Sequence, residues 1–579
     1  MKWLHDLVKS SYLPEVNSVE EEAGKLSIVR ILLGFVLFYR TFQLVNSSQY
    51  YFDTLDQYTM GLWFLGITFF FMIGFLTPIM TILIVFFYHR LDTTMSSFTL
   101  GSSIMVLLTT VFLFTNIGGL KYSVDSYFLK KKDALSLLIK KVYGLLGTPS
   151  VEKIGTVYFL SIFTYALISL GALIWHIQDP TWIKGETVVT FMDNSFLCKY
   201  FVEMREFHKA YPQIFLYYSM FSIFGQSVFQ LLMIPLLFTR YGTFYVKMWG
   251  LGFFLASLFI LQLSYLPHVE LLMWFLIFYV SKKDFTISIV YDDYCNLCKK
   301  AIKFFQVVNW NKAYVFVPLS KNKQLVEEKG FNQNDLQAEM HGFNETDVYV
   351  GYDLYIKLVK VNPLLVILWP ILLLGKVTRI GPFIYKYIAY NRLKYFGTCE
   401  LSYNVNKENS KPKFFPKPQK ELVFKLGMIG VFATYILFLL FQYPFIQQKT
   451  IKYYQSKNKI ESYSKVITWL NRTPFVMPLV FNQTDLMMGD RWAVIYRIKD
   501  GKRELVPITN LDGGRANYEN FDWLFLSNHN SDVLYFGNSV KYRRGIIGQD
   551  PVAFHQQGAY GFALLANRIK YDYRKTNQQ

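Results

Sequence analysis

Two cysteines three positions apart, Cys295 and Cys298, are the residues of this sequence best suited to chemistry. They follow the apolar run Ile287–Tyr291, which predicts a buried strand, and they begin a stretch with the periodicity of an amphipathic helix. Cys295 would lie near the helix N-terminus, where the helix dipole and the lysines that follow favour a thiolate over a thiol. Thiol–disulfide exchange requires such an accessible attacking sulfur, with a resolving sulfur within reach.

Two other interpretations of the cysteine pair remain open at this point. A C-x-x-C motif can form half of a zinc site, but no second Cys/His pair has matching spacing, and Cys399 and His341 are too scattered to complete one. The cysteines can also be two buried structural residues. The chain has only four cysteines in 579 residues, so no disulfide framework is expected.

Residues 285–400 resemble the DCC family of thiol-disulfide oxidoreductases. The stretch "VYDDYCNLC" resembles the family signature D-x-x-C-x-x-C, carried here by Asp292, Cys295 and Cys298. The resemblance implies a thioredoxin-like fold in which Cys295 attacks, Cys298 resolves, and Asp292 orients or buffers protons. The family usually has Gly after the Asp, and here Asp293 is expected to raise the pKa of a neighbouring thiol. The later stretch "YKYIAYNRLKYFGTCE" resembles the closing segment of the family, with supporting residues Asn391, Arg392, Gly397 and Cys399.

The composition indicates a polytopic membrane protein. Hydrophobic residues make up 52% of the chain and aromatic residues 18%, which is too apolar for a soluble surface. The net charge of +19 lies largely in Lys and Arg beside apolar runs, so we expect a lipid bilayer as partner and no nucleic acid.

Apolar runs predict nine transmembrane helices, because helices satisfy the backbone within lipid. The run from residue 60 to 96 is divided in two, since "GFLTP" favours a break at Gly74–Pro78. This division keeps the lysine-rich loop around Lys130 inside and the loop "NSSQYYFDTLDQYTM", which has no Lys or Arg, outside. The N-terminus is then cytoplasmic and the C-terminus extracytoplasmic. The predicted spans are 26–46, 60–76, 77–96, 98–116, 155–176, 213–239, 244–264, 267–281 and 421–443.

These spans divide the chain into parts. Residues 1–25 are a cytoplasmic N-terminal segment, and 26–282 are a membrane domain of eight spans. Residues 283–400 are a cytoplasmic thioredoxin-like α/β domain, in which "PLLVILWPILLLG" is too short to span and is expected to be a packed helix. A basic linker (401–420) and the ninth span (421–443) follow. Residues 444–579 form a small extracytoplasmic α+β or β-rich domain with a hairpin turn at Asp500–Gly501.

Residues 20–282 resemble the HTTM (horizontally transferred transmembrane) domain of vitamin K-dependent gamma-carboxylases. The points of contact are "YSVD" (122–125) and "WIKGETV" (182–188). The resemblance implies a quinone or lipid-like ligand. In the carboxylases a lysine before the Trp-x-x-Gly element is the base, but here His176 or Ile177 holds that position. No lysine lies between Lys153 and Lys184, so carboxylase activity is not expected.

Four polar or aromatic residues are candidates for a site in the membrane domain. His176 either lines a cavity or lies at the interface beside Trp182. Arg30 either reaches the interface or lines a cavity, and Gln230 either bonds a neighbouring helix or contacts a ligand.

Together these patterns predict a bacterial inner-membrane thiol–disulfide oxidoreductase, with a quinone as a cofactor by analogy and no metal. The alternative is a non-catalytic scaffold whose outer domain binds an envelope or secretion partner. A weaker alternative is a carboxylase-like enzyme that uses His176 as base.

Overall fold

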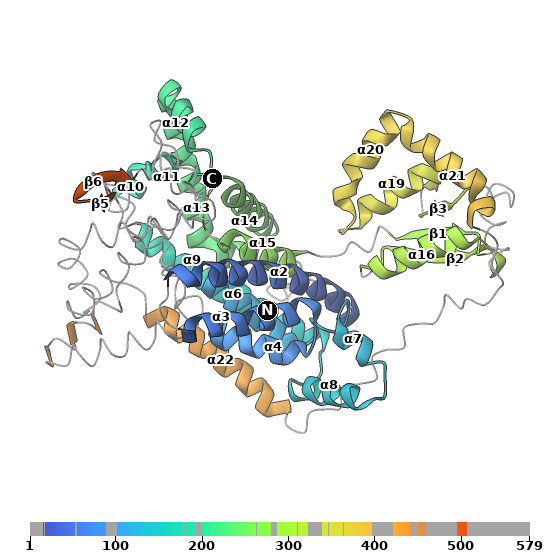
Figure 1. Cartoon of the computed structure of the whole chain (residues 1–579), viewed down its shortest axis with the longest axis horizontal. Helices are drawn as coiled ribbons and strands as arrows, with labels where there is room; N and C mark the ends of the chain where they lie inside the picture. The colour runs from blue at the N-terminus through green and yellow to red at the C-terminus, as the bar shows by residue number, and fades with distance from the viewer. Residues whose placement is uncertain are drawn as a thin grey trace. The chain divides into compact units, whose positions relative to one another are not determined.

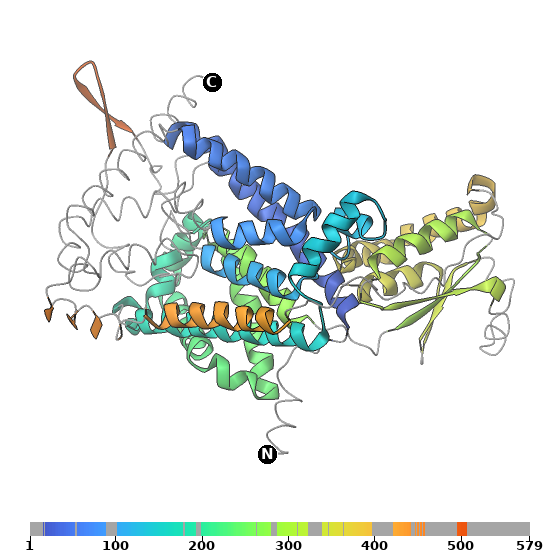
Figure 2. The same cartoon turned by 90° about the horizontal axis from the view of Figure 1, so that it is seen from below.

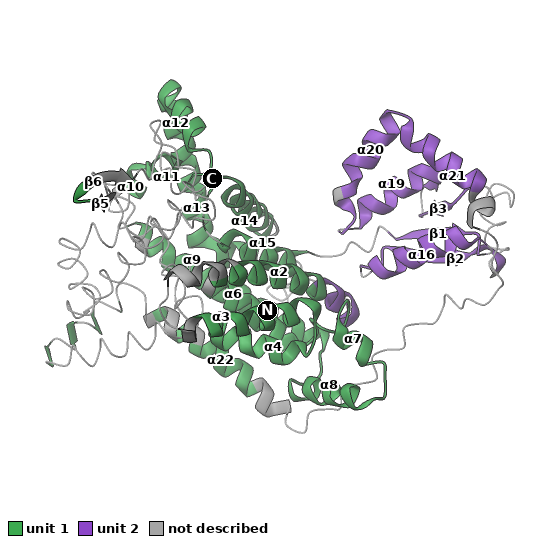
Figure 3. Ribbon diagram, in the orientation of Figure 1, with its two compact units in different colours: residues 1–16, 26–279, 415–579 green, residues 17–25, 280–414 purple. Residues whose placement is uncertain are grey.

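The computed structural model describes most of the chain up to residue 396 and three stretches beyond it. The described residues are 16, 18–51, 55–88, 101–177, 180–192, 198–261, 263, 265–279, 286–321 (without 294 and 310), 339–396 (without 345, 346 and 363), 421–441, parts of 446–457, and 495–506. The chain forms two compact units, and each is considered by itself (Figure 3). Unit 1 holds residues 1–16, 26–279 and 415–579, and unit 2 holds residues 17–25 and 280–414.

The described residues of unit 1 are mainly helical, with one hairpin and one isolated bridge between Cys198 and Leu261. All nine predicted spans contain a helix. Among the described residues, three helices are long and apolar enough to cross a membrane: 151–174, 212–237 and 241–260. The number of spans stays a prediction. The helices are α2 (Val19–Tyr51, which begins in unit 2), α3 (Leu55–Ile73), α4 (Thr77–Leu83), η1 (Ile84–Tyr88), α6 (Ser102–Thr115), α7 (Val124–Phe128), α8 (Ala134–Leu145), α9 (Val151–His176), α10 (Pro180–Lys184), α11 (Thr187–Met192), α12 (Phe201–Ala210), α13 (Pro212–Leu237), α14 (Arg240–Ile260), α15 (Leu266–Phe278) and α22 (Glu421–Phe441).

Helix α9 occupies a central place in this unit. It packs against α6, α13 and α22, and Figures 1 and 2 show α22 running beside it. Helices α13, α14 and α15 pack against one another in sequence order. Segments far apart in the chain therefore enclose the space between α9, α13, α14 and α15.

The predicted break at Gly74–Pro78 is confirmed. Helix α3 ends at Ile73, Gly74 has a φ of 71°, and α4 begins at Thr77 with Pro78 in its first turn. A Cβ atom at residue 74 would lie 1.9 Å from Nη1 of Arg30, so only glycine fits this turn.

Beyond residue 457, the described part of the C-terminal region is a hairpin. Strands β5 (Ile495–Lys499) and β6 (Lys502–Val506) pair antiparallel around Asp500 and Gly501, both with positive φ. This confirms the predicted turn. The remaining C-terminal predictions lie outside the described residues, as does the linker 401–420.

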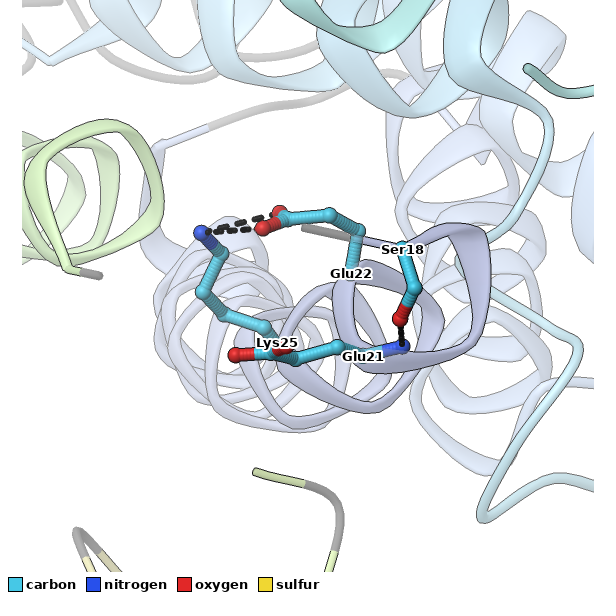
Figure 4. A network of polar contacts seen from close by, with 4 residues as sticks. All are labelled: Ser18, Glu21, Glu22 and Lys25. Atoms are coloured by element: carbon cyan, nitrogen blue, oxygen red, sulfur yellow. Dashed lines mark hydrogen bonds and ion pairs between the residues drawn. The ribbon is translucent and has the colours of Figure 1, made fainter. Parts of the chain in front are cut away.

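Helix α2 begins with a small polar network, drawn in Figure 4. The Ser18 hydroxyl accepts a hydrogen bond from the Glu21 backbone N–H at 3.2 Å, which caps the first turn. One turn later Lys25 Nζ pairs with Glu22 Oε2 at 2.8 Å, and both side chains are buried. Burial of a matched pair holds the start of this long helix in one conformation, since either charge alone would be costly there.

Unit 2 is built on a mixed four-stranded sheet of order β2-β1-β3-β4. Strand β1 pairs parallel with β2 and antiparallel with β3, and β3 pairs antiparallel with β4. Alternate β1 residues Ile287, Ile289 and Tyr291 pack with α16 and α19 in one apolar core. The elements are β1 (Ile287–Tyr291), α16 (Asn296–Val308), β2 (Tyr314–Pro318), η3 (Leu319–Lys321), β3 (His341–Phe343), β4 (Val348–Val350), α19 (Gly351–Val361), η4 (Val366–Leu368), α20 (Trp369–Val377) and α21 (Ile380–Phe396).

Candidate functional site

The dithiol lies where β1 passes into α16. Cys295 is the N-cap of α16, and its Sγ accepts a hydrogen bond from the backbone N–H of Cys298 at 3.4 Å. The backbone N–H of Cys295 donates to the carbonyl oxygen of Asp292 at 3.3 Å, which holds the turn between strand and helix. The predicted strand and helix are confirmed. An amide at the positive end of a helix stabilises a thiolate more than a thiol, so this geometry suits an attacking sulfur.

Both sulfurs are buried thiols. Cys295 is 0% exposed and Cys298 is 5% exposed. The expectation of an accessible attacking sulfur was therefore wrong for this conformation, because a capping side chain folds back over the first turn of its own helix. The same burial agrees with the alternative of two structural cysteines. Among the described residues no group of three His, Cys, Asp or Glu side chains could hold a metal ion.

Asp293, the departure from the DCC pattern, has a structural partner. Its carboxylate accepts hydrogen bonds from the backbone N–H of Ser320, at 3.0 Å, and from the Ser320 hydroxyl. Asp293 is 7% exposed, and Ser320 lies in η3 directly after β2. The carboxylate thus joins the turn after β1 to the end of the parallel neighbour strand.

The supporting residues predicted from the closing DCC segment lie on or after α21. Asn391 donates to the carbonyl oxygen of Tyr387 at 2.9 Å, one turn earlier in the same helix. Arg392 belongs to α21, but its side chain is outside the described residues, as are Gly397 and Cys399. Their role at the dithiol stays a prediction.

A second candidate site is a cavity of about 390 Å³ within unit 1. It is enclosed by α6, α9, α10, α11, α13, α14 and α15, and its wall is mostly apolar and aromatic. A few polar side chains project from that wall, as is usual in sites for small organic ligands. Three of the four predicted membrane-site residues line it: His176, Trp182 and Gln230.

His176 and Trp182 form a stacked pair in the cavity wall. Their ring centroids are 4.3 Å apart with an angle of 12° between the planes, and the Trp182 indole N–H donates to Ser227 Oγ at 3.2 Å. His176 is 4% exposed, so the alternative of an interfacial histidine reaching water is not observed. Both rings line the cavity, so its wall is aromatic at this point.

Gln230 and Gln226 of α13 supply amides to the same wall. Gln226 Oε1 accepts from the Trp249 indole N–H at 3.0 Å, which fixes it between α13 and α14. Gln230 is 6% exposed, and its Oε1 is a buried acceptor with no hydrogen-bond partner in the structure. A buried unpaired acceptor is costly, and a ligand hydroxyl would satisfy it.

The sequence reasoning missed the pair formed by Glu270 and Tyr165. The Tyr165 hydroxyl donates to Glu270 Oε1 at 3.1 Å, across 105 residues of sequence, and both residues line the cavity. The available signal was a lone carboxylate inside a predicted span, which by itself marks a functional candidate. Glu270 is therefore a second ionisable residue in the cavity wall, in addition to His176, which the sequence had predicted.

Arg30, the fourth residue predicted for the membrane-domain site, does not line this cavity. It is fully buried, and its guanidinium donates to the carbonyl oxygens of Phe71 at 3.1 Å and Tyr122 at 2.7 Å. The Phe71 carbonyl also accepts from the Gly74 N–H at 3.1 Å, and Tyr122 lies in the loop before α7, so the arginine joins the end of α3 to that loop. Its role is to hold the break.

The "YSVD" element stabilises the start of α4, on the other side of the same break. Asp125 accepts from the backbone N–H groups of Leu76 and Thr77, at 2.7 and 2.8 Å, and from the Tyr143 hydroxyl at 2.9 Å. Burial raises the pKa of Asp125, and the hydrogen bonds from Thr77, Tyr143 and Leu76 oppose that rise. Asp125 therefore acts as the N-terminal cap of α4.

Comparison with known proteins concerns unit 2 alone. The family model described as DCC1-like thiol-disulfide oxidoreductase matches residues 289–398, less than a fifth of the chain. This segment begins within β1, contains the dithiol and ends after α21, and it supports the DCC resemblance. No curated protein and no solved structure matches the chain. The HTTM resemblance rests on the sequence motifs.

Proposed function

We propose that residues 283–400 form a thiol–disulfide oxidoreductase domain in which Cys295 attacks and Cys298 resolves. The observation that carries this proposal is the dithiol at the N-terminus of α16, directly after β1, in a segment that matches a family of thiol-disulfide oxidoreductases. A C-x-x-C motif beside a β-α-β unit is typical of thioredoxin-like redox domains. The parallel pair β1–β2 with α16 between them, and the antiparallel β3 and β4, support that finer assignment.

The exchange follows from the two sulfurs. The Cys295 thiolate attacks a substrate disulfide, forms a mixed disulfide and releases one substrate thiol. Cys298 then loses its proton, with Asp292 as the proposed acceptor, and attacks Cys295. The Cys295–Cys298 disulfide forms and the second substrate thiol leaves, so the substrate gains two electrons and two protons. Because Cys295 is fully buried, substrate binding must expose it before the first step.

Trapping the mixed disulfide tests this order. Full-length Cys298→Ser, reconstituted and incubated with a fluorescent disulfide peptide, is expected to accumulate a covalent adduct through Cys295. Cys295→Ser should form none. Cys198→Ser is the matched control, since Cys198 is a thiol of unit 1 buried at 1%. If native Cys298→Ser forms no adduct, although the same protein forms one when it is unfolded, the redox proposal is contradicted.

The burial of both sulfurs supports a second function. In that case unit 2 is an inert domain, and the chain is a membrane scaffold whose outer domain binds an envelope or secretion partner. Resistance of Cys295 and Cys298 to alkylation in the native protein, with a stoichiometric partner in mild-detergent purification, would favour the scaffold.

We further propose that the cavity of unit 1 binds a quinone or lipid-like ring compound. The stacked His176–Trp182 pair provides a flat surface for a ring, and Gln230 Oε1 provides an acceptor for a hydroxyl. If the exchange runs in reverse, a substrate dithiol reduces the Cys295–Cys298 disulfide and is itself oxidised to a disulfide. The restored Cys295–Cys298 dithiol then passes two electrons and two protons to the quinone, which becomes a hydroquinone. Gln230→Leu should weaken binding of a short-chain hydroquinone, measured by quenching of tryptophan fluorescence. An unchanged affinity would argue against this site.

The cellular setting belongs to the same proposal. The apolar helices agree with a membrane protein, and the lysine distribution supports a bacterial cytoplasmic membrane with the N-terminus and unit 2 inside and the C-terminus outside. Thiol labelling from each side of sealed vesicles tests this topology. Labelling of Cys295 only from the outside would overturn it.

A further inference from the structure

Helices α20 and α21 carry an unusually apolar exposed surface. The expectation of a packed helix at "PLLVILWPILLLG" holds for one side only: Leu365 lies in the core of unit 2 and Trp369 and Leu372 pack against it, but no residue of α20 is fully buried. We define the α20–α21 surface by its six most exposed large apolar side chains, each 59–74% exposed: Ile371, Leu374, Val377, Ile380, Phe383 and Tyr390. Such clusters are rare on soluble domains and mark a surface that binds something.

The opposite side of the two helices is anchored within unit 2. The Tyr352 hydroxyl of α19 donates to the carbonyl oxygen of Leu372 at 3.1 Å, and a Cβ atom at Gly381 would lie 2.3 Å from its ring. Tyr385 of α21 accepts from the Met340 backbone N–H at 3.2 Å and packs its ring near Tyr355. The exposed side chains therefore project from helices that the domain holds firmly, rather than from a loose tail.

Helices α20 and α21 themselves carry only positive charge, and Lys376 pairs with Asp353 of the neighbouring helix α19 at 2.7 Å. From residue 354 to residue 399 the sequence contains no Asp or Glu, and it contains seven basic residues: Lys357, Lys360, Lys376, Arg379, Lys386, Arg392 and Lys394. Arg379 and Lys386 are exposed among the apolar side chains of the surface. Exposed apolar groups interleaved with cations, without acids, match the interface of an anionic bilayer.

Helix length and chain connection limit the mode of contact. Nine residues of α20 extend roughly 14 Å, about half of a hydrocarbon core, so this helix cannot span. Helix α21 carries Lys386 at its middle, and neither helix is among those apolar and long enough to cross. Eight residues connect the apolar helix α15 to β1, so unit 2 follows an apolar helix through a short stretch of chain.

We propose that the α20–α21 surface docks unit 2 on a membrane that contains anionic lipid. The two helices lie in the headgroup region, with Val377, Ile380 and Phe383 among the upper acyl chains and Arg379 and Lys386 at the phosphates. This proposal does not depend on whether the Cys295–Cys298 dithiol is reactive. In this proposal the α20–α21 surface holds unit 2 at the surface of the bilayer.

Photocrosslinking of the full-length protein tests the docking. Benzoylphenylalanine replaces Phe383 in one variant and Phe304 in another, since Phe304 is a 51% exposed phenylalanine on α16 of the same unit. Each variant is reconstituted into phosphatidylcholine vesicles with or without phosphatidylglycerol, irradiated and analysed by mass spectrometry. We expect lipid adducts at position 383, more of them with phosphatidylglycerol, and few at position 304.

The charge dependence gives a second readout. Arg379→Gln or Lys386→Gln should lower the equilibrium constant for docking about fivefold in phosphatidylglycerol vesicles, because each cation at an anionic surface contributes about 1 kcal/mol. In vesicles of pure phosphatidylcholine, both variants should dock to the same extent as the wild-type protein. Crosslinks at position 383 to protein instead of lipid, within the chain, to a second copy or to another protein, would overturn the proposal. Equal lipid adducts at 383 and 304 would also overturn it.

Discussion

Replacing Gly225 by alanine should disturb the membrane cavity through one neighbouring indole. A Cβ atom at this position of α13 would lie 1.9 Å from Cη2 of Trp249, whereas ordinary contacts begin at 3.4 Å. The ring must therefore move by the difference, about 1.5 Å. It is not free to move without cost, because its N–H donates to Gln226 at 3.0 Å and its face stacks near Tyr245.

The expected magnitude has two parts. Overpacking in a filled interior costs about 1–3 kcal/mol, and loss of the Trp249–Gln226 hydrogen bond costs about 1 kcal/mol more. We expect the Gly225→Ala protein to lose about 2–4 kcal/mol of stability in detergent micelles. Because Trp249 lines the cavity, a ligand that packs against it should lose about 1–2 kcal/mol, or five- to thirtyfold in Kd.

The assay is titration of a short-chain hydroquinone, followed by tryptophan fluorescence, beside thermal unfolding of the same samples. Gly252→Ala is the matched control, since residue 252 also lines the cavity and a Cβ atom there meets nothing within 4 Å. That variant should keep wild-type stability and affinity. Equal behaviour of Gly225→Ala and Gly252→Ala would refute the reasoning.

Three further substitutions test separate parts of the structure. Asp125→Ala should destabilise unit 1 by about 2–4 kcal/mol, since two backbone N–H groups of α4 and a buried tyrosine hydroxyl lose their acceptor; thermal unfolding measures it. Because burial raises the pKa of Asp125, the native state holds its proton to higher pH than the unfolded state, so stability falls as pH rises from the unfolded pKa through the raised one. Asp125→Asn should lack this pH-dependent loss, and an identical pH profile would argue against it. Asp293→Ala should lower the stability of unit 2 by about 1–3 kcal/mol, because Ser320 loses its acceptor. Faster hydrogen exchange in β2 would measure this loss, and an unaltered exchange rate would show that the carboxylate does not stabilise the strand. Tyr165→Phe should cost about 1–3 kcal/mol because Glu270 loses its donor, whereas Tyr165→Phe added to Glu270→Gln should cost less; additive losses would contradict the coupling.

The sequence by itself determined the features that depend on neighbouring residues. Apolar runs predicted where the helices of unit 1 lie, "GFLTP" predicted the break that Gly74 makes, and the run before Cys295 predicted a strand that passes into a helix. These follow from backbone preferences and side-chain periodicity over a few residues, which the local sequence controls.

The tertiary structure decided the features that depend on distant partners. Whether Cys295 is accessible depends on what packs over the first turn of α16, and spacing alone predicted the opposite of its burial. Arg30 and His176 were equal candidates in sequence, but one holds a helix break and the other lines the cavity. Glu270 gained its partner Tyr165 only when helices 105 residues apart came together, because long-range packing fixes such contacts and no local pattern encodes them.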